Sequence, residues 1–174
     1  MWVLLPISLG LPLKKTELEV VSRSPNETRE IGRLLGEQAQ PGQVFLLLGD
    51  LGAGKTCLTQ GILWGLGAED FARSPTFVMV AEHAYRLHVY HVDLYRLDRP
   101  LEVSEIGLDE YLGSDGLCIV EWADRAPDLL STGFLQIRLS TVSEERRRIR
   151  FVDPIGDYNG LIEAVGAARY RAEE

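Results

Sequence analysis

A glycine-rich segment between an apolar run and a helical pattern constrains this chain more than any other feature. Residues 44–48 (VFLLL) contain no polar side chain, which indicates a strand buried on both faces of a largely parallel sheet. Residues 49–56 (GDLGAGKT) then match the pattern G-x-x-x-x-G-K-[ST] at every fixed position. From Lys55 to about Leu66 the residues fit a helix that ends at Gly67. A buried strand, a glycine loop and a helix in this order predict an α/β fold.

The chemistry of this segment suits the phosphates of a nucleotide. Glycine lets backbone N–H groups turn toward phosphate oxygens without a Cβ clash, and the following helix adds its free N–H groups and positive dipole end. Lys55 can reach the β- and γ-phosphates, and the Thr56 hydroxyl suits Mg²⁺. The segment is therefore predicted to be a phosphate-binding loop (P-loop). Its residues are Gly49, Asp50, Leu51, Gly52, Ala53, Gly54, Lys55 and Thr56.

Two acids are placed to complete such a site. Hydrolysis or transfer of a phosphoryl group needs an acid near Mg²⁺ and the γ-phosphate. In this architecture such acids lie at the carboxyl ends of the strands beside the P-loop strand. Glu121 ends the apolar run Leu117–Val120, and Asp93 ends the run Arg86–Val92. We predict that both serve phosphate chemistry; the alternative for each is an acid at a strand end without a chemical role.

Three histidines lie close together in the sequence, at His83, His88 and His91. A zinc site is not expected, because His88 and His91 point to opposite faces of a strand and the two cysteines lack ligand spacing. The cysteines are instead expected to be small buried residues. His91 and Asp93 share a face, so a hydrogen bond between them is expected.

The rest of the chain predicts a single domain over residues 16–174, after a flexible extension at 1–15. The fold class is α/β, a P-loop nucleotide hydrolase with a mostly parallel central sheet, an antiparallel portion and helices on both faces. A capping box with Pro25 at the first helical position starts a helix at Ser24. The elements expected besides those above are helices at 25–39, 100–111 and 159–171, and strands at 77–81, 86–93, 135–139 and 148–152, with a tight connection around Glu82-His83-Ala84.

Composition excludes some functions and favours a compartment. The net charge of −8 excludes a wholly basic surface for nucleic acid. The arginine run Arg146–Arg150 could still form a local patch that contacts RNA, but its simpler interpretation is a solvated hairpin turn. Two cysteines are too few for a disulfide framework. The apolar start, Trp2–Leu13, is too short for a membrane span. Its lysines follow it, whereas a secretory signal carries its positive charges before the apolar run. We expect a cytoplasmic protein without membrane association, with an interfacial anchor as the alternative.

Several segments together resemble the TsaE (YjeE) family of small bacterial ATPases. They are the P-loop, residues 74–77 (SPTF), residues 91–97 (HVDLYRL) and residues 120–122 (VEW), in that order and at similar spacing. The P-loop is generic, whereas the other three segments are specific to the family. The resemblance runs from about Ser24 to Val152.

The resemblance implies a role in making N6-threonylcarbamoyladenosine, the modified base next to the anticodon of some tRNAs. A member of this family binds ATP and Mg²⁺ and hydrolyses ATP slowly. It acts on a complex of two partners, TsaB and TsaD, of which TsaD transfers the threonylcarbamoyl group. The protein would drive a cycle of that complex and meet tRNA through its partners.

The resemblance also assigns roles to single residues. Residues 52–57 would wrap the phosphates, so that Cys57 joins the nucleotide-binding set. Thr56 and Glu121 would hold Mg²⁺, Asp93 would serve hydrolysis, and Lys55 and Glu121 complete the catalytic set.

Two further placements follow from the resemblance alone. Thr76 would lie on a switch-like loop. The adenine would lie between the region of Ser24-Pro25 and the turn near Glu145-Arg146.

Of three alternative functions, two remain open from the residues and one is excluded. A small-molecule P-loop kinase usually carries an arginine-rich lid, and here the arginine cluster lies late, at 146–150. A GTPase is excluded, because its N-K-x-D motif needs a lysine beyond Lys55, which is the last one in the chain. A nucleotide-dependent scaffold would differ from an ATPase only in turnover.

Overall fold

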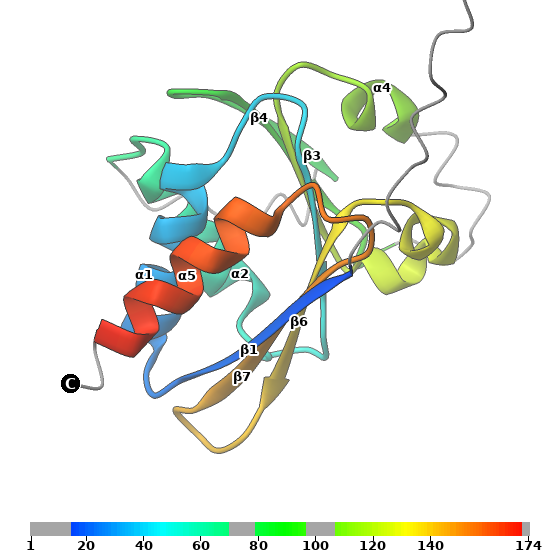
Figure 1. Cartoon of the computed structure of the whole chain (residues 1–174). Coiled ribbons are helices and arrows are strands. Elements are labelled where there is room, and N and C mark those ends of the chain that lie inside the picture. Colours follow the sequence, from blue (N-terminus) through cyan, green and yellow to red (C-terminus); the bar gives the residue numbers. More distant parts are fainter. Residues whose placement is uncertain (1–14, 70–78, 97–106, 172–174) are drawn as a thin grey trace, which may run out of the picture.

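A mixed sheet of seven strands forms the centre of the molecule in this computed structural model, which describes residues 15–69, 79–96 and 107–171 (Figure 1). The strand order is β1-β7-β6-β2-β5-β4-β3. The strands are β1 (Thr16–Ser22), β2 (Val44–Leu48), β3 (Val80–Ala84), β4 (His88–Asp93), β5 (Leu117–Glu121), β6 (Leu135–Thr141) and β7 (Arg147–Asp153). The helices are α1 (Pro25–Gln38), α2 (Lys55–Gly65), α4 (Leu108–Leu112) and α5 (Asn159–Arg171), with short 3-10 helices η1 (Ala123–Arg125) and η2 (Pro127–Ser131).

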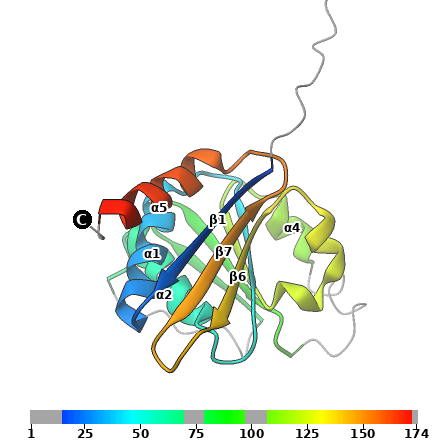
Figure 2. The same ribbon diagram turned by 60° about the horizontal axis from the view of Figure 1, so that its bottom comes forward.

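The centre of the sheet is parallel and its edges are antiparallel, as expected. β2 pairs in parallel with both β5 and β6, and β5 pairs in parallel with β4. On one side β1 and β6 both run antiparallel to β7, and the three strands lie side by side in Figure 2; on the other side β3 runs antiparallel to β4. The carboxyl ends of β2, β5 and β4 therefore meet at one edge of the sheet, where the P-loop begins.

Helices cover both faces of the sheet, which confirms the predicted layering (Figure 1). On one face α1, α2 and α5 bury side chains such as Leu35, Leu58 and Val165 against the sheet. On the other face α4 and the two 3-10 helices contribute Leu108 and Leu129 to a second cluster. Both faces of β2 are thereby buried, in agreement with its unbroken apolar sequence.

Close packing against α1 fixes the position of α2, the helix that follows the P-loop. A Cβ at Gly36 would lie 2.0 Å from the Ile62 carbonyl oxygen, and one at Gly61 would lie 2.1 Å from that of Arg29. The two helices thus touch backbone to backbone, which only glycine allows. The start of α1 is also fixed, because the Ser24 hydroxyl accepts a hydrogen bond of 3.1 Å from the Glu27 N–H, as the predicted cap requires.

The structure corrects the prediction for the β3–β4 hairpin. The tight connection was expected around Glu82-His83-Ala84, but these residues belong to β3, and the turn lies at 85–87. The ladder pairs Ala84 with His88, and the Tyr85 N–H closes the turn by donating to the Leu87 carbonyl over 3.1 Å. The hairpin forms there because cross-strand pairing, which a local pattern does not reveal, extends β3 toward the turn.

Some expected elements differ in extent or lie outside the described residues. β1 was not predicted, although its alternation of charged and apolar residues carries a strand signal. Of the helix expected at 100–111, residues 107–111 are described, and α4 starts after Gly107, whose φ is 65°. The extension at 1–14 lies outside the described residues. Within the described ranges, none of the helices has the length and hydropathy needed to cross a membrane.

Candidate functional site

The predicted P-loop forms a glycine turn between β2 and α2. Gly49 has φ 139° and Gly54 has φ 103°, which places both in backbone regions that other residues rarely adopt. A Cβ at Gly49 would also lie 2.3 Å from the Leu139 carbonyl oxygen. Ala53 is buried, whereas the Leu51 side chain is 76% exposed at the tip of the loop. The turn is thus built around conformations that only glycine supplies at low cost.

Lys55 lies inside this turn. Its side chain is buried, and Nζ donates hydrogen bonds to the carbonyl oxygens of Gly49 and, over 2.9 Å, Asp50. The ammonium also lies 3.5 Å from the centroid of the Trp122 ring, a cation–π contact. Burial lowers the pKa of Lys55, while the charge of Glu121 acts in the opposite direction. The loop thus encloses a positive charge next to its own backbone.

Glu121 provides the carboxylate of the site. It ends β5 with 1% of its surface exposed, so its charge needs hydrogen-bond donors. The Thr56 hydroxyl lies 3.0 Å from Oε2, whereas the Thr59 hydroxyl and the His91 Nε2 each lie 2.9 Å from Oε1. The two oxygens therefore have different surroundings. The expected hydrogen bond between His91 and Asp93 is replaced by this one to Glu121.

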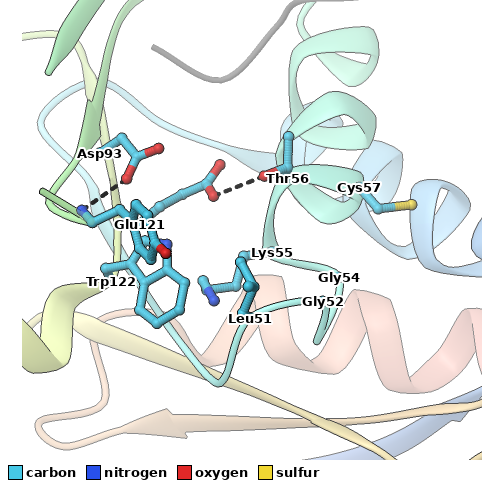
Figure 3. A pocket seen from close by; sticks show the side chains of 10 residues that line it. Leu51, Gly52, Gly54, Lys55, Thr56, Cys57, Asp93, Glu121 and Trp122 are labelled. Atoms are coloured by element: carbon cyan, nitrogen blue, oxygen red, sulfur yellow. Dashed lines mark hydrogen bonds between the residues drawn. The ribbon is translucent and has the colours of Figure 1, made fainter. Parts of the chain in front are cut away.

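Asp93 lies at the end of β4, directly beside Glu121 in the sheet register. Its side chain is 5% exposed, and Oδ1 accepts a hydrogen bond of 2.9 Å from the Tyr95 N–H (Figure 3). This turn holds the carboxylate at the edge of the sheet, facing the P-loop helix. The structure thus brings both predicted acids to the same place as Lys55 and Thr56.

A cavity of about 280 Å³ joins these groups (Figure 3). Its lining residues are Leu51, Gly52, Gly54, Lys55, Thr56, Cys57, Asp93, Tyr95, Glu121 and Trp122. A smaller cavity of about 50 Å³ shares Gly54 and Cys57 with it. The other residues that line the smaller cavity are Pro25, Thr28, Glu145 and Arg147. Cys57 is half-buried, and its thiol lies 3.2 Å from the Pro25 carbonyl oxygen, toward which it can donate.

The structure reveals site residues that the motif analysis did not assign. Thr59 follows Lys55 by four positions, so helical geometry places it one turn deeper on the same side of α2. Trp122 adopts φ 58° and packs against Tyr95 with ring centroids 4.9 Å apart. Arg147 reaches the loop from β7, with Nη2 3.4 Å from the Gly52 carbonyl oxygen. Of these three residues, only Thr59 carried a local signal in the sequence, which is its spacing of four positions from Lys55.

The residues present fit a nucleotide with Mg²⁺. Mg²⁺ prefers oxygen ligands and keeps several waters, so one carboxylate and one hydroxyl suffice from the protein. Oε2 of Glu121 and Oγ1 of Thr56 supply this pair at the cavity. Among the described residues no three His, Cys, Asp or Glu side chains gather as a metal cage. Thr76 and the rest of 74–77 lie outside the described residues.

Comparisons with known proteins show which family this chain resembles. The family model for "Threonylcarbamoyl adenosine biosynthesis protein TsaE" matches residues 22–149. A Bacillus subtilis protein named "tRNA threonylcarbamoyladenosine biosynthesis protein TsaE" is 40% identical over 141 residues, which are 80% of this chain and 88% of that protein. A Treponema pallidum protein of the same name is 36% identical over 132 residues, which are 76% of this chain and 98% of that one.

A solved structure also resembles this fold. The crystal structure of Bacillus subtilis YdiB superposes with a TM-score of 0.75 and 34% identity, covering 90% of this chain and 98% of that one. The family match begins at the last residue of β1 and ends within β7, so it contains the P-loop and both acids.

Proposed function

The chain belongs to the TsaE family of threonylcarbamoyl adenosine biosynthesis proteins, and we propose that it is a Mg²⁺-dependent, slow ATPase that serves this modification of tRNA. The observation that carries the proposal is the hydrogen bond of 3.0 Å between Thr56 Oγ1 and Glu121 Oε2 at the mouth of the P-loop. It places a hydroxyl and a carboxylate side by side, next to the enclosed ammonium of Lys55. Phosphoryl chemistry on a P-loop needs these three groups together.

Each residue of the site has a distinct task in this proposal. The loop N–H groups and Lys55 bind the phosphates, and Lys55 exchanges its carbonyl partners for phosphate oxygens. Thr56 and Glu121 hold Mg²⁺, which when bound withdraws charge from the phosphate oxygens. Asp93 orients the attacking water and accepts its proton. The low exposure of both carboxylates supports these roles, because excluded water strengthens each electrostatic contact.

The smaller cavity supports a place for the adenine. It is lined by Pro25 and Thr28 from the start of α1 and by Glu145 and Arg147 from the β6–β7 hairpin. These are the two regions between which the base is expected to lie. The planar guanidinium of Arg147 offers a surface on which the base can stack.

Membership of the family supports a proposal for the partners. We propose that the chain acts in the cytoplasm on a complex of TsaB and TsaD homologues and meets tRNA through them. The net charge of −8 supports indirect contact, because phosphate backbones attract basic surfaces. Ion pairs of Arg148 with Glu19 and of Arg150 with Glu17 also offset the positive charge of these two arginines of β7.

A binding and turnover experiment tests this function. The purified chain is mixed with TsaB and TsaD homologues under ATP, ADP or no nucleotide, and co-purification and phosphate release are measured. We expect ATP-dependent capture and hydrolysis that the partner complex stimulates. Transfer of the γ-phosphoryl group to a small molecule in a metabolite mixture would identify a kinase instead. Nucleotide-dependent capture without any phosphate release would identify a scaffold.

A further inference from the structure

The two oxygens of the Glu121 carboxylate have separate surroundings. Oε1 faces the protein, where Thr59 Oγ1 and His91 Nε2 each lie at 2.9 Å, and all three side chains are buried to 1% exposure. Oε2 faces the cavity, where its hydrogen-bond donor is the partly exposed Thr56. The carboxylate therefore has one oxygen held by buried side chains and one oxygen that faces the cavity.

Thr59 is suited to anchor Oε1. Its hydroxyl has one proton and two acceptors in reach, Oε1 at 2.9 Å and the Lys55 carbonyl oxygen at 3.1 Å. A hydrogen bond to an ionised acceptor is stronger than one to a neutral carbonyl, so the proton goes to Glu121. Thr59 lies in a helix that is packed backbone to backbone against α1, so the backbone that carries this hydroxyl is held in place.

His91 anchors the same oxygen from the sheet. Its Nε2 can donate to a carboxylate only when it carries a proton, and in the neutral ring Nδ1 is then an acceptor. Nδ1 is buried and has no hydrogen-bond partner among the residues that the structure describes. Among the described residues, Glu121 Oε1 is therefore the hydrogen-bond partner of the ring, which has no second polar partner at Nδ1.

We propose that Thr59 and His91 are positioning residues that hold Oε1 of Glu121, so that Oε2 and Thr56 together are presented to Mg²⁺. The inference rests on the proposed function, because it assumes that Glu121 is a metal ligand. It adds two residues that act through Glu121 and do not touch the nucleotide. Groups that orient a metal ligand in this way typically change metal affinity about 10–100-fold when removed.

The test measures Mg²⁺ dependence separately from nucleotide affinity. A non-hydrolysable ATP analogue is titrated calorimetrically into the full chain in EDTA and at rising Mg²⁺. For Thr59→Val and His91→Leu we expect the Mg²⁺ concentration at half-saturation to rise about 10–100-fold, with unchanged affinity in EDTA. Thr59→Ser and His91→Gln, which keep a donor, should stay near the parent chain. His88→Leu, at the exposed start of β4, is the matched control.

A double-variant cycle separates positioning from general stability. In a Glu121→Ala background, Thr59→Val and His91→Leu should have no further effect on Mg²⁺ dependence, because the group they hold is gone. Thr59→Ala replaces Thr59→Val if the latter does not fold by circular dichroism. An additional effect in that background, or equal losses with and without Mg²⁺, would overturn the inference. Unchanged Mg²⁺ dependence in both apolar variants would overturn it as well.

The proposed function fails in a different way. If the parent chain binds the analogue equally well in EDTA and in Mg²⁺, the Mg²⁺ site itself is wrong, and this inference falls with it. If the parent chain responds to Mg²⁺ through Glu121 but not through Thr59 and His91, only the inference falls.

Discussion

Thr56 and Glu121 join the first turn of α2 to the carboxyl end of β5 by a hydrogen bond of 3.0 Å between Oγ1 and Oε2. The two residues are 65 positions apart in the chain. They meet because β2, which leads into the P-loop, pairs in parallel with β5, so that both strands end at the same edge. This pair gives the site its proposed metal position.

Lys55→Ala should weaken ATP binding by about 100-fold or more. The ammonium is the one side-chain cation enclosed by the loop among the described residues, and charge-assisted hydrogen bonds to phosphate are about 1.5–3 kcal/mol each. Calorimetric titration with ATP checks this result. Arg150→Ala, on the exposed face of β7, is the control and should bind ATP normally. If the Lys55 variant binds ATP with the affinity of the parent chain, the nucleotide does not bind at this loop.

Asp93→Ala should lower turnover more than ATP affinity. Asp93 is assigned to the attacking water, and general-base catalysis contributes about 10²–10⁴-fold. Steady-state phosphate release and ATP titration on the same preparation separate the two quantities. Because Oδ1 also accepts the Tyr95 N–H, the variant loses a turn contact. Equal losses of turnover and affinity would therefore argue for a structural role.

The two cysteines should differ in reactivity. Burial raises the pKa of Cys118 to about 12, so at pH 8 about one thiol in 10⁴ is the reactive thiolate. Burial also raises the pKa of Cys57, but this half-buried thiol lines both cavities. Alkylation followed by mass spectrometry should label Cys57 slowly and Cys118 only after unfolding, and ATP should protect Cys57. Labelling of Cys57 that ignores ATP would contradict the proposed nucleotide position.

The contact between α1 and α2 should tolerate no added methyl group. Gly61→Ala places a Cβ 2.1 Å from the Arg29 carbonyl oxygen, and overpacking of this kind costs about 1–3 kcal/mol. Gly160→Ala is the matched control, because its Cβ meets no atom within 4 Å at the start of α5. Urea unfolding should show a lower free energy of unfolding for the first variant and an equal or higher one for the second. Equal stability of both variants would contradict the close approach of the helices.

Local signals predicted the parts of the fold that depend on neighbouring residues. The strand β2, the capped start of α1 and the range of α5 agree with the sequence pattern, because an apolar run, a capping residue and helical spacing are signals that neighbouring residues carry. The P-loop and both acids were assigned in the same way, from a motif and two strand ends. Both acids at the strand ends, Asp93 and Glu121, line the cavity.

Long-range pairing decides the parts that the sequence did not reveal. β1 forms because it pairs with β7, more than 100 residues away. The position of the β3–β4 turn depends on the ladder between the two strands. His91 contacts Glu121 because the register of β4 and β5 places the two residues diagonally across the strands. The spacing of residues within β4 does not reveal this register.

Phosphate release by Glu121→Ala across a Mg²⁺ titration tests the central claim most directly. We predict that the parent chain hydrolyses ATP in Mg²⁺ and not in EDTA, and that the variant requires more Mg²⁺ and turns over more slowly because Oε2 is lost. Hydrolysis by the variant at the parent rate and with the parent's Mg²⁺ dependence would contradict the account.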